Sequence, residues 1–271
     1  MDGRVRLYAG MLLTVTSLCT AALFACAGGN AVEAFAQKQA RTEATQQTGA
    51  QPQRAPSGPL EGMVIAVDAG HGGYDGGAVG RVSGTLEKEL NLDVARRVER
   101  LLSEQGAQVV MTRTEDYALC DEDPPIRKKL QDMQRRAAII REAGAQMVLS
   151  IHMNEYAGRS ESGPQVFFRE DCPAGRLLAG ALQEAMNTAL APSRPRSALG
   201  GDYYILTLGV PSALVECGFL SNRQEEAMLL TEDYRERVAQ AVAQGVVNWA
   251  ALPDDKPAPL EAVDRSDEPT G

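Results

Sequence analysis

The sequence predicts an α/β fold: one domain with a central, mostly parallel, twisted sheet of about six strands and helices on both faces. Short runs rich in β-branched residues alternate along the chain with segments whose apolar residues recur at helical spacing. Of the 271 residues, 44% are hydrophobic and 23% are charged, as is typical of a globular protein. No internal repeat interrupts the alternation, so we expect a single domain.

Each predicted strand is a short apolar run bounded by glycine, proline or polar residues. The first, MVIAVD, is followed by Gly70, and the last, SALVEC, follows Pro211. We expect strands at 63–68, 108–111, 147–151, 165–168, 203–206 and 212–217.

Each predicted helix has apolar residues on one stripe. In the first helix this stripe is formed by Leu90, Val94, Val98 and Leu101, and Gly106 follows its end. The spacing of Ser221 and Gln224 is a capping-box signature that opens a short helix. We expect helices at 85–105, 127–143, around 178–186, from 221 onward, and 234–249.

The N-terminal segment, residues 1–36, has the layout of a secretory signal peptide. Arg4 and Arg6 precede an uncharged, mainly apolar stretch over 7–27, and an A-x-A arrangement follows at 34–36. Two alternatives stay open: the stretch is retained as a membrane anchor, or Cys26 is lipidated within a lipobox-like LFAC. All three predict a location outside the cytoplasm, in the cell envelope, with membrane contact only through this segment.

Two further segments flank the predicted domain. Residues 37–60 are rich in Gln, Thr, Ala and Pro without an apolar period, and are expected to form a flexible linker. Residues 253–271 are rich in proline and acidic residues, and are expected to form a disordered acidic tail. The folded domain is therefore expected at 61–252.

The charge balance argues against a nucleic-acid partner. The chain has 27 Lys and Arg residues against 36 Asp and Glu, a net charge of −9. A net acidic surface repels phosphate backbones, so no nucleic-acid binding is expected.

Three cysteines lie in the predicted domain, and no C-x-x-C pair is present, which excludes a structural zinc site of that kind. Cys120 and Cys172 lie in polar surroundings and could pair in an oxidising compartment. Cys217 lies within an apolar run and reads as a small buried residue.

Polar residues gather where predicted strands end. The chain has two histidines: His71 follows the first strand within GHGG, and His152 follows the third. Glu216 stands inside the last strand, where an unpaired buried charge would be costly. The carboxyl ends of parallel strands share one sheet edge, where ligands bind, so we expect these three residues near one another.

A third metal ligand is expected from the first helix. Two histidines and a carboxylate form a ligand set that catalytic zinc uses, with a fourth position left for water. Glu87 falls on the inward stripe with Leu90 and Val94, whereas Glu89 and Asp93 fall on the opposite face. Alternatively, Glu87 simply favours the positive end of its helix.

Other chemistries fit less well. The glycine-rich loop lacks the G-x-G-x-x-G and G-K-S/T patterns of nucleotide sites, and no G-x-S-x-G elbow of serine hydrolases is present. A cysteine hydrolase using Cys217 with His152 stays open, although Glu216 beside Cys217 would raise the thiol pKa. A non-catalytic wall-binding protein is the other alternative.

The motifs resemble a known family. IAVDAGHGGYDGGAVGRVSGTLEKELNL is similar to the opening of the zinc-dependent N-acetylmuramoyl-L-alanine amidases of type 3, and LSIHMN and ALVECGFLSNRQEEAMLL resemble that family's later motifs. The resemblance covers essentially all of 62–250. RKKLQDMQRR and VECGFLSN are most similar to the germination-specific subgroup of spore-forming bacteria.

The resemblance implies that His71, Glu87 and His152 bind one zinc ion per chain and that Glu216 is the catalytic carboxylate. Asp68 and Asn154 flank the ligands and are expected either to orient them or to serve as ordinary polar caps at strand ends. Two departures from the family pattern touch no ligand position: Ala69 replaces a usual proline, and Glu155 follows the His-x-Asn motif.

The implied substrate is peptidoglycan, and the implied reaction is hydrolysis of the amide between N-acetylmuramic acid and L-alanine. In the germination-specific subgroup this is the first step towards muramic δ-lactam in the spore cortex. An envelope activator protein is a candidate partner.

Overall fold

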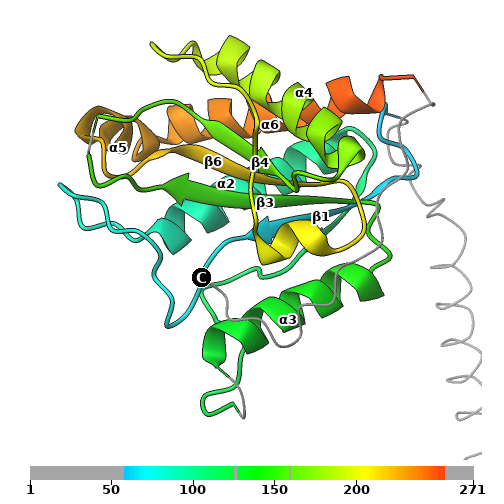
Figure 1. Ribbon diagram of the computed structural model, residues 1–271, viewed down its shortest axis with the longest axis horizontal. Helices are drawn as coiled ribbons and strands as arrows, with labels where there is room; N and C mark the ends of the chain where they lie inside the picture. Colours follow the sequence, from blue (N-terminus) through cyan, green and yellow to red (C-terminus); the bar gives the residue numbers. More distant parts are fainter. Residues whose placement is uncertain (1–57, 125–126, 159, 254–271) are drawn as a thin grey trace, which may run out of the picture. The chain divides into compact units, whose positions relative to one another are not determined.

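The computed structural model describes residues 58–253 apart from 125–126 and 159. These residues form a single α/β domain with a mostly parallel mixed sheet between helices, as predicted (Figure 1). The segments predicted as signal peptide or anchor, most of the linker, and nearly all of the acidic tail lie outside the described residues. None of the described helices is long and apolar enough to cross a membrane.

The sheet of the described residues has six strands in the order β2-β1-β3-β6-β4-β5. Strands β2, β1, β3 and β6 run parallel, β4 is antiparallel to β6, and β5 pairs in parallel with β4 at the edge. The strands are β1 (Val64–Ala69), β2 (Gln108–Met111), β3 (Met147–Asn154), β4 (Gln165–Phe168), β5 (Leu199–Gly200) and β6 (Ser212–Phe219).

Helices cover the two faces of the sheet unequally. Figure 1 shows α3 on one side of the sheet and α4 and α6 on the other. The elements are α2 (Glu87–Glu104), α3 (Lys128–Glu142), α4 (Pro173–Leu190), the 3₁₀ helix η1 (Tyr204–Thr207), α5 (Arg223–Leu229) and α6 (Glu232–Ala250).

Alternation along the strands divides the core into two parts. In β1, Ile65 and Val67 belong to the larger core, which packs against α2, α4 and α6. Ala66 points to the opposite face and joins a smaller core with α3 and η1. Asp68, the next residue on that face, is buried but polar. The face that only α3 and η1 cover among the described helices, here called the thinly covered face, thus turns from apolar to polar towards the carboxyl ends of the strands.

One predicted strand is wrong. Residues 203–206 do not form a strand, because Tyr204–Thr207 form η1, closed by a hydrogen bond from the Leu206 N–H to the Tyr203 carbonyl. A four-residue apolar run has no period that separates a strand from a helical turn. The sixth strand is instead the two-residue β5, which is too short to leave a signal in the sequence.

The start of α5 differs from the capping-box prediction by one residue. Asn222 caps this helix, and its side-chain oxygen accepts from the N–H groups of Gln224 and Glu225. The Ser221 hydroxyl instead accepts from the Tyr156 N–H at 2.8 Å. Ser221 therefore connects the end of β6 to the loop after β3.

Candidate metal centre

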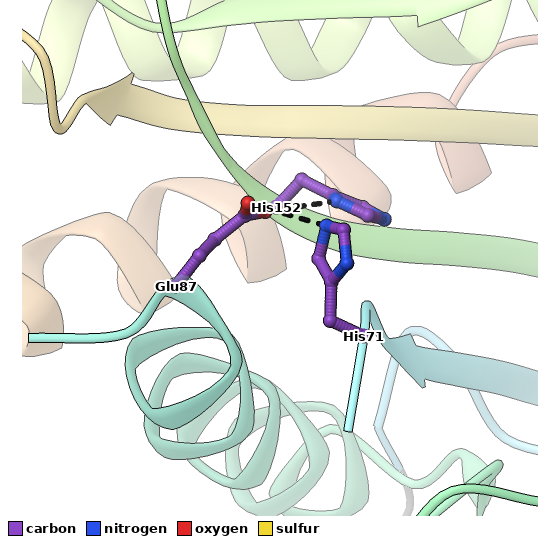
Figure 2. Close-up of side chains that lie close together, drawn as sticks. All are labelled: His71, Glu87 and His152. Atoms are coloured by element: carbon purple, nitrogen blue, oxygen red, sulfur yellow. Dashed lines mark hydrogen bonds and ion pairs between the residues drawn. The ribbon is translucent and has the colours of Figure 1, made fainter. Parts of the chain in front are cut away.

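The structure brings His71, Glu87 and His152 together from three separate elements. His71 lies in the loop after β1, Glu87 is the first residue of α2, and His152 lies in β3 (Figure 2). One ligand atom from each side chain falls within 4.8 Å of the other two. The two histidines lie close together because β1 and β3 are parallel neighbours whose carboxyl ends reach the same edge of the sheet.

The Glu87 carboxylate lies between the two imidazoles. Its Oε2 is 3.2 Å from Nε2 of His71, and its Oε1 is 3.0 Å from Nδ1 of His152. The two rings are nearly perpendicular, with centroids 5.0 Å apart. Figure 2 shows the three side chains pointing toward one another. Two imidazoles and one carboxylate thus form a single cluster of potential metal ligands.

Glu87 faces inward, as its place on the helix predicts, and is only 3% exposed. Its carboxylate accepts from the backbone N–H groups of Ala78 and Met153 and from the side-chain amide of Asn91. Burial alone would raise the pKa of Glu87, but the hydrogen bonds and charges of His152 and His71 outweigh it and hold the pKa well below its usual range. Glu87 is therefore ionised when it meets a cation.

Two glycines make room for this cluster. A Cβ on Gly70 would lie 2.3 Å from Nε2 of His152, so the imidazole packs directly on the main chain. Gly77 has a φ of +68°, and a Cβ there would lie 2.4 Å from Oε2 of Glu87. The glycine-rich loop after β1 therefore serves close packing around the ligands.

His71 has an unusual backbone and a carboxylate neighbour. Its φ is +61°, in the left-handed region that non-glycine residues rarely adopt. Its Nδ1 lies 2.9 Å from Oδ2 of Asp75, four residues on, at ion-pair distance but outside regular hydrogen-bond geometry. Burial alone would lower the pKa of His71, but Asp75 and Glu87 outweigh it and raise the pKa to about 9. Such a carboxylate orients an imidazole so that its other nitrogen faces a metal.

Sequence reasoning missed Asp75. A signal was present, because a carboxylate four residues after the histidine, in a loop rich in glycine, can fold back onto the ring. The positive φ of His71, which makes this return compact, leaves no mark in the sequence.

Glu216 lies beside this cluster on β6, where it is the register partner of His152 on β3. Among the described residues, its Oε2 is buried without a hydrogen-bond partner. Burial and the charge of Glu87 raise the pKa of Glu216 to about 7, against the opposing effect of the histidines. A buried carboxylate that titrates near neutrality is suited to carry a proton.

A cleft of about 570 Å³ opens over these residues on the thinly covered face of the sheet. His71, His152 and Glu216 line it from the strand ends. Lys129 and Met133 line it from α3, and further residues from η1 complete the opposite wall. The cleft is large enough to receive part of an extended ligand.

The two flanking polar residues differ in their surroundings. Asp68 is buried and accepts from Thr112, Ser150 and Arg136, which hold its pKa at about 2 although burial alone would raise it. Its hydrogen-bond and ion-pair partners within the described part of the chain are these three residues and not the histidines. Asn154 contributes its backbone carbonyl, which accepts from the Leu220 N–H.

The three cysteines that the structure describes do not take part in this site. Cys120, Cys172 and Cys217 are free, so the open pairing of Cys120 with Cys172 is absent here. Cys172 instead caps α4, where its sulfur accepts from the Gly175 N–H. Cys217 is fully buried in the larger core, and burial together with Glu216 and Glu87 raises its pKa far above neutrality. A thiol without thiolate character argues against a cysteine hydrolase.

The donor set fits zinc. Neutral imidazole nitrogens and a carboxylate are the ligands of catalytic three-residue zinc sites. Glu216 lines the same cleft as His71 and His152, and its unsatisfied Oε2 supplies a hydrogen-bond acceptor there.

Comparison with known proteins agrees with this geometry. The family model described as Amidase_3, N-acetylmuramoyl-L-alanine amidase, matches residues 65–248. The chain is 36% identical over 202 residues to the germination-specific N-acetylmuramoyl-L-alanine amidase of Bacillus subtilis, covering 73% of this chain and 84% of that protein.

Solved structures show the same likeness. The CwlD amidase from Clostridioides difficile, solved in complex with the GerS lipoprotein, is similar with a TM-score of 0.68 and 32% identity, over 70% of this chain and 100% of that one. The catalytic domain of CwlV from Bacillus (Paenibacillus) polymyxa is similar with a TM-score of 0.61 and 30% identity, over 69% and 97%. The predicted family and enzyme class are confirmed: the chain belongs to the Amidase_3 family and is an N-acetylmuramoyl-L-alanine amidase.

Proposed function

We propose that this enzyme uses one zinc ion, held by His71, Glu87 and His152, to hydrolyse the amide between N-acetylmuramic acid and L-alanine in peptidoglycan. The observation that carries the proposal is the convergence of these three side chains within 4.8 Å, beside the unsatisfied carboxylate oxygen of Glu216. When bound, zinc supplies a Lewis acid that activates water and polarises the scissile carbonyl.

The protein's own residues divide the remaining work. Glu87, buried and ionised, contributes the negative charge of the ligand set, and Asp75 orients the His71 ring through its Nδ1. Glu216 accepts the proton of the attacking water at Oε2 and delivers it to the departing alanine nitrogen. Its raised pKa suits both steps, because the group binds and releases a proton near neutral pH.

Substrate access supports the same assignment. A polymeric substrate needs an open site, and the cleft over the cluster is lined by α3, by η1 and by Tyr74 and Asp75 of the loop after β1. Tyr203 and Tyr204 of the η1 wall offer amphipathic surfaces to a glycan or stem peptide.

For the biological role we propose maturation of the spore cortex, as the first step towards muramic δ-lactam. The support is the 36% identity to the germination-specific amidase of Bacillus subtilis. We also propose an extracytoplasmic location and, because the similar CwlD amidase was solved with the GerS lipoprotein, an envelope partner protein. Fusion of residues 1–60 to a reporter that works only after export tests the location.

The direct test combines metal analysis with an assay of bond cleavage. The purified enzyme, supplied with zinc, is expected to hold about one zinc per chain and to release new L-alanine amino groups from peptidoglycan. Retention on peptidoglycan without release of amino groups would contradict the proposal. So would full activity in a folded enzyme that a chelator has freed of zinc.

A further inference from the structure

Three successive backbone carbonyls need partners where β1 ends. The last ladder bond of this strand runs from the Gly70 N–H to the Ile151 carbonyl at 3.0 Å. Beyond this point, no hydrogen bond to the backbone of a neighbouring strand is found for the carbonyls of Ala69, Gly70 and His71 among the described residues. Buried carbonyls without partners are costly, so their hydrogen bonds must come from side chains.

Arg136 of α3 supplies two of these bonds. Its side chain is 2% exposed, and it donates to the Ala69 carbonyl at 2.8 Å and to the His71 carbonyl at 2.7 Å. Asp68 and Asp132 balance its charge at 2.7 and 2.6 Å. The backbone oxygen of a proposed ligand is thus tied to a fully paired guanidinium.

Arg113, just after β2, bonds the carbonyls of Ala69 and Gly70, and the side-chain amide of Asn91 also donates to the Gly70 carbonyl at 3.1 Å. The Arg113 side chain is 0% exposed, and its Nε donates to the Ala69 carbonyl at 2.9 Å. Its Nη2 donates both to the Gly70 carbonyl at 2.9 Å and to the Lys88 carbonyl at 2.8 Å. One nitrogen therefore bridges the residue before His71 and the residue after Glu87.

Only a guanidinium can make this set of bonds. It offers five N–H donors in a rigid planar fork, whereas the ammonium of lysine is a compact charge on a flexible stem. Arg113 also donates to the Glu115 carbonyl, so all its acceptors are backbone oxygens and none is a carboxylate. Ion pairing therefore does not explain its burial, whereas the fixed geometry of the carbonyls does.

The backbone held in this way is strained. His71 has a φ of +61°, which costs free energy for a residue with a Cβ and persists only where the surroundings fix it. The anchored carbonyls belong to the two residues before His71 and to His71 itself. Without them, we expect His71 to relax to an ordinary backbone region, which would swing its ring away from Glu87.

We propose that Arg113 and Arg136 are positioning residues, which together hold His71 in its left-handed conformation and fix its distance from Glu87. The inference rests on the proposed function, because it concerns the geometry of the proposed zinc ligands. It adds two residues that touch neither metal nor substrate.

The test compares Arg113→Met and Arg136→Met, and the corresponding lysine variants, with the matched control Arg97→Met. Arg97 pairs with Asp93 and Glu236 between α2 and α6, away from the site. Zinc affinity is measured on the full chain by competition with a chelating indicator, and folding by circular dichroism. We expect zinc affinity to fall 10- to 100-fold in all four site variants and to stay unchanged in the control.

Two spectroscopic readouts separate positioning from a general loss of stability. The chain has only two histidines, so selective ¹⁵N labelling reports both rings without overlap, in zinc-free as well as zinc-loaded protein. We expect the His71 signals to move in the variants, and the visible spectrum of the cobalt-substituted enzyme to change. The lysine variants should not restore either signal.

Each other outcome overturns the inference. Folded variants with the zinc affinity, histidine signals and cobalt spectrum of the unmodified enzyme would show that the arginines do not position the site. Failure of all four variants to fold, with the control intact, would show that they hold the domain together instead. Absence of zinc binding in the unmodified enzyme would refute the proposed function, whereas unchanged His71 signals in the zinc-free variants would refute the positioning role alone.

Discussion

His152 and Glu216 are register partners on the adjacent parallel strands β3 and β6, and their side chains lie on the same face of the sheet. One belongs to the candidate ligand set, and the other ends in a buried oxygen without a hydrogen-bond partner among the described residues. The sheet itself therefore fixes the separation between the metal cluster and the candidate proton carrier.

Replacing Glu216 by glutamine should separate proton transfer from metal binding. The amide keeps the size of the side chain but cannot accept and release the proton, so we expect activity to fall by roughly 10²–10⁴-fold while zinc content stays near that of the unmodified enzyme. Turnover, zinc content and melting temperature should be measured on the same preparation. A folded, zinc-loaded Glu216→Gln enzyme with normal turnover would show that another group is the base.

Removing the Glu87 carboxylate should cost zinc as well as activity. Glu87 lies between both imidazoles, so Glu87→Ala leaves only two ligands. Loss of a residue that merely hydrogen-bonds to a metal ligand typically lowers metal affinity about 10- to 100-fold, and we expect the loss of a ligand itself to cost at least as much. Glu89→Ala, two residues on and exposed, is the control and should bind zinc normally. Equal zinc affinity in the two variants would contradict the ligand assignment.

A single methyl group at Gly70 should displace His152. The added Cβ would lie 2.3 Å from Nε2, closer than atoms pack, so the ring must move. We expect Gly70→Ala to fold but to bind zinc at least about tenfold more weakly. Gly180→Ala in α4 meets nothing within 4 Å and should leave zinc binding unchanged. Chelator competition on both variants checks this, and wild-type affinity in Gly70→Ala would sink the packing argument.

The zinc-free protein should lose stability as the pH rises above 7. Native His71 keeps its proton up to a pKa of about 9, whereas the unfolded chain releases it near 6.5, so this contribution is complete below pH 6.5 and lost through pH 9. Glu216 acts with the same sign in a lower window, between 4.5 and about 7. The pKa of Cys217 is raised above its ordinary value of 9, which adds the same sign at higher pH, so melting temperatures between pH 7 and about 8.5 report His71 most directly.

Bound zinc should remove the fall of the melting temperature with rising pH, because a metal at His71 takes the place of the proton. Asp75→Asn in the zinc-free protein should also flatten it, since Asp75 raises the His71 pKa. Parallel curves with and without zinc would argue that His71 is not a ligand.

Cys217→Ser distinguishes the amidase from a cysteine hydrolase. Cys217 is fully buried on the core side of β6, so the change should lower the melting temperature by a few degrees and leave turnover within about threefold, since only packing is altered. A chelator should abolish activity in both forms. Complete loss of turnover in a folded Cys217→Ser enzyme would favour the thiol mechanism.

Periodicity was sufficient to predict the main elements of the fold. The alternation of apolar runs and helical stripes is strong over α2, α3 and the central strands, whose predicted and observed bounds differ by a few residues. It failed at η1 and β5, because four apolar residues fit a strand or a turn and two residues carry no period. The conformation of these two short segments depends on their packing against the rest of the domain, which the spacing of apolar residues does not record.

The grouping of His71, Glu87 and His152 could be predicted from the sequence, but the side chains that support them could not. Glu87 could be found because the helical stripe fixes its direction, and His71 and His152 because parallel strands end at one edge. Asp75, Arg113 and Arg136 act through a bent backbone, and their role depends on a positive φ and on carbonyl directions that no spacing rule records.

The three side chains of the candidate metal centre are separated along the chain by 16 and 65 residues, and they meet only when β1 and β3 pair with each other. Such long-range pairing forms late relative to local helices, because loop closure costs entropy before the contacts compensate for it. A nascent or partly folded chain would therefore hold a metal weakly and cleave nothing. We therefore expect this amidase to act on its polymeric substrate only after the whole domain has folded.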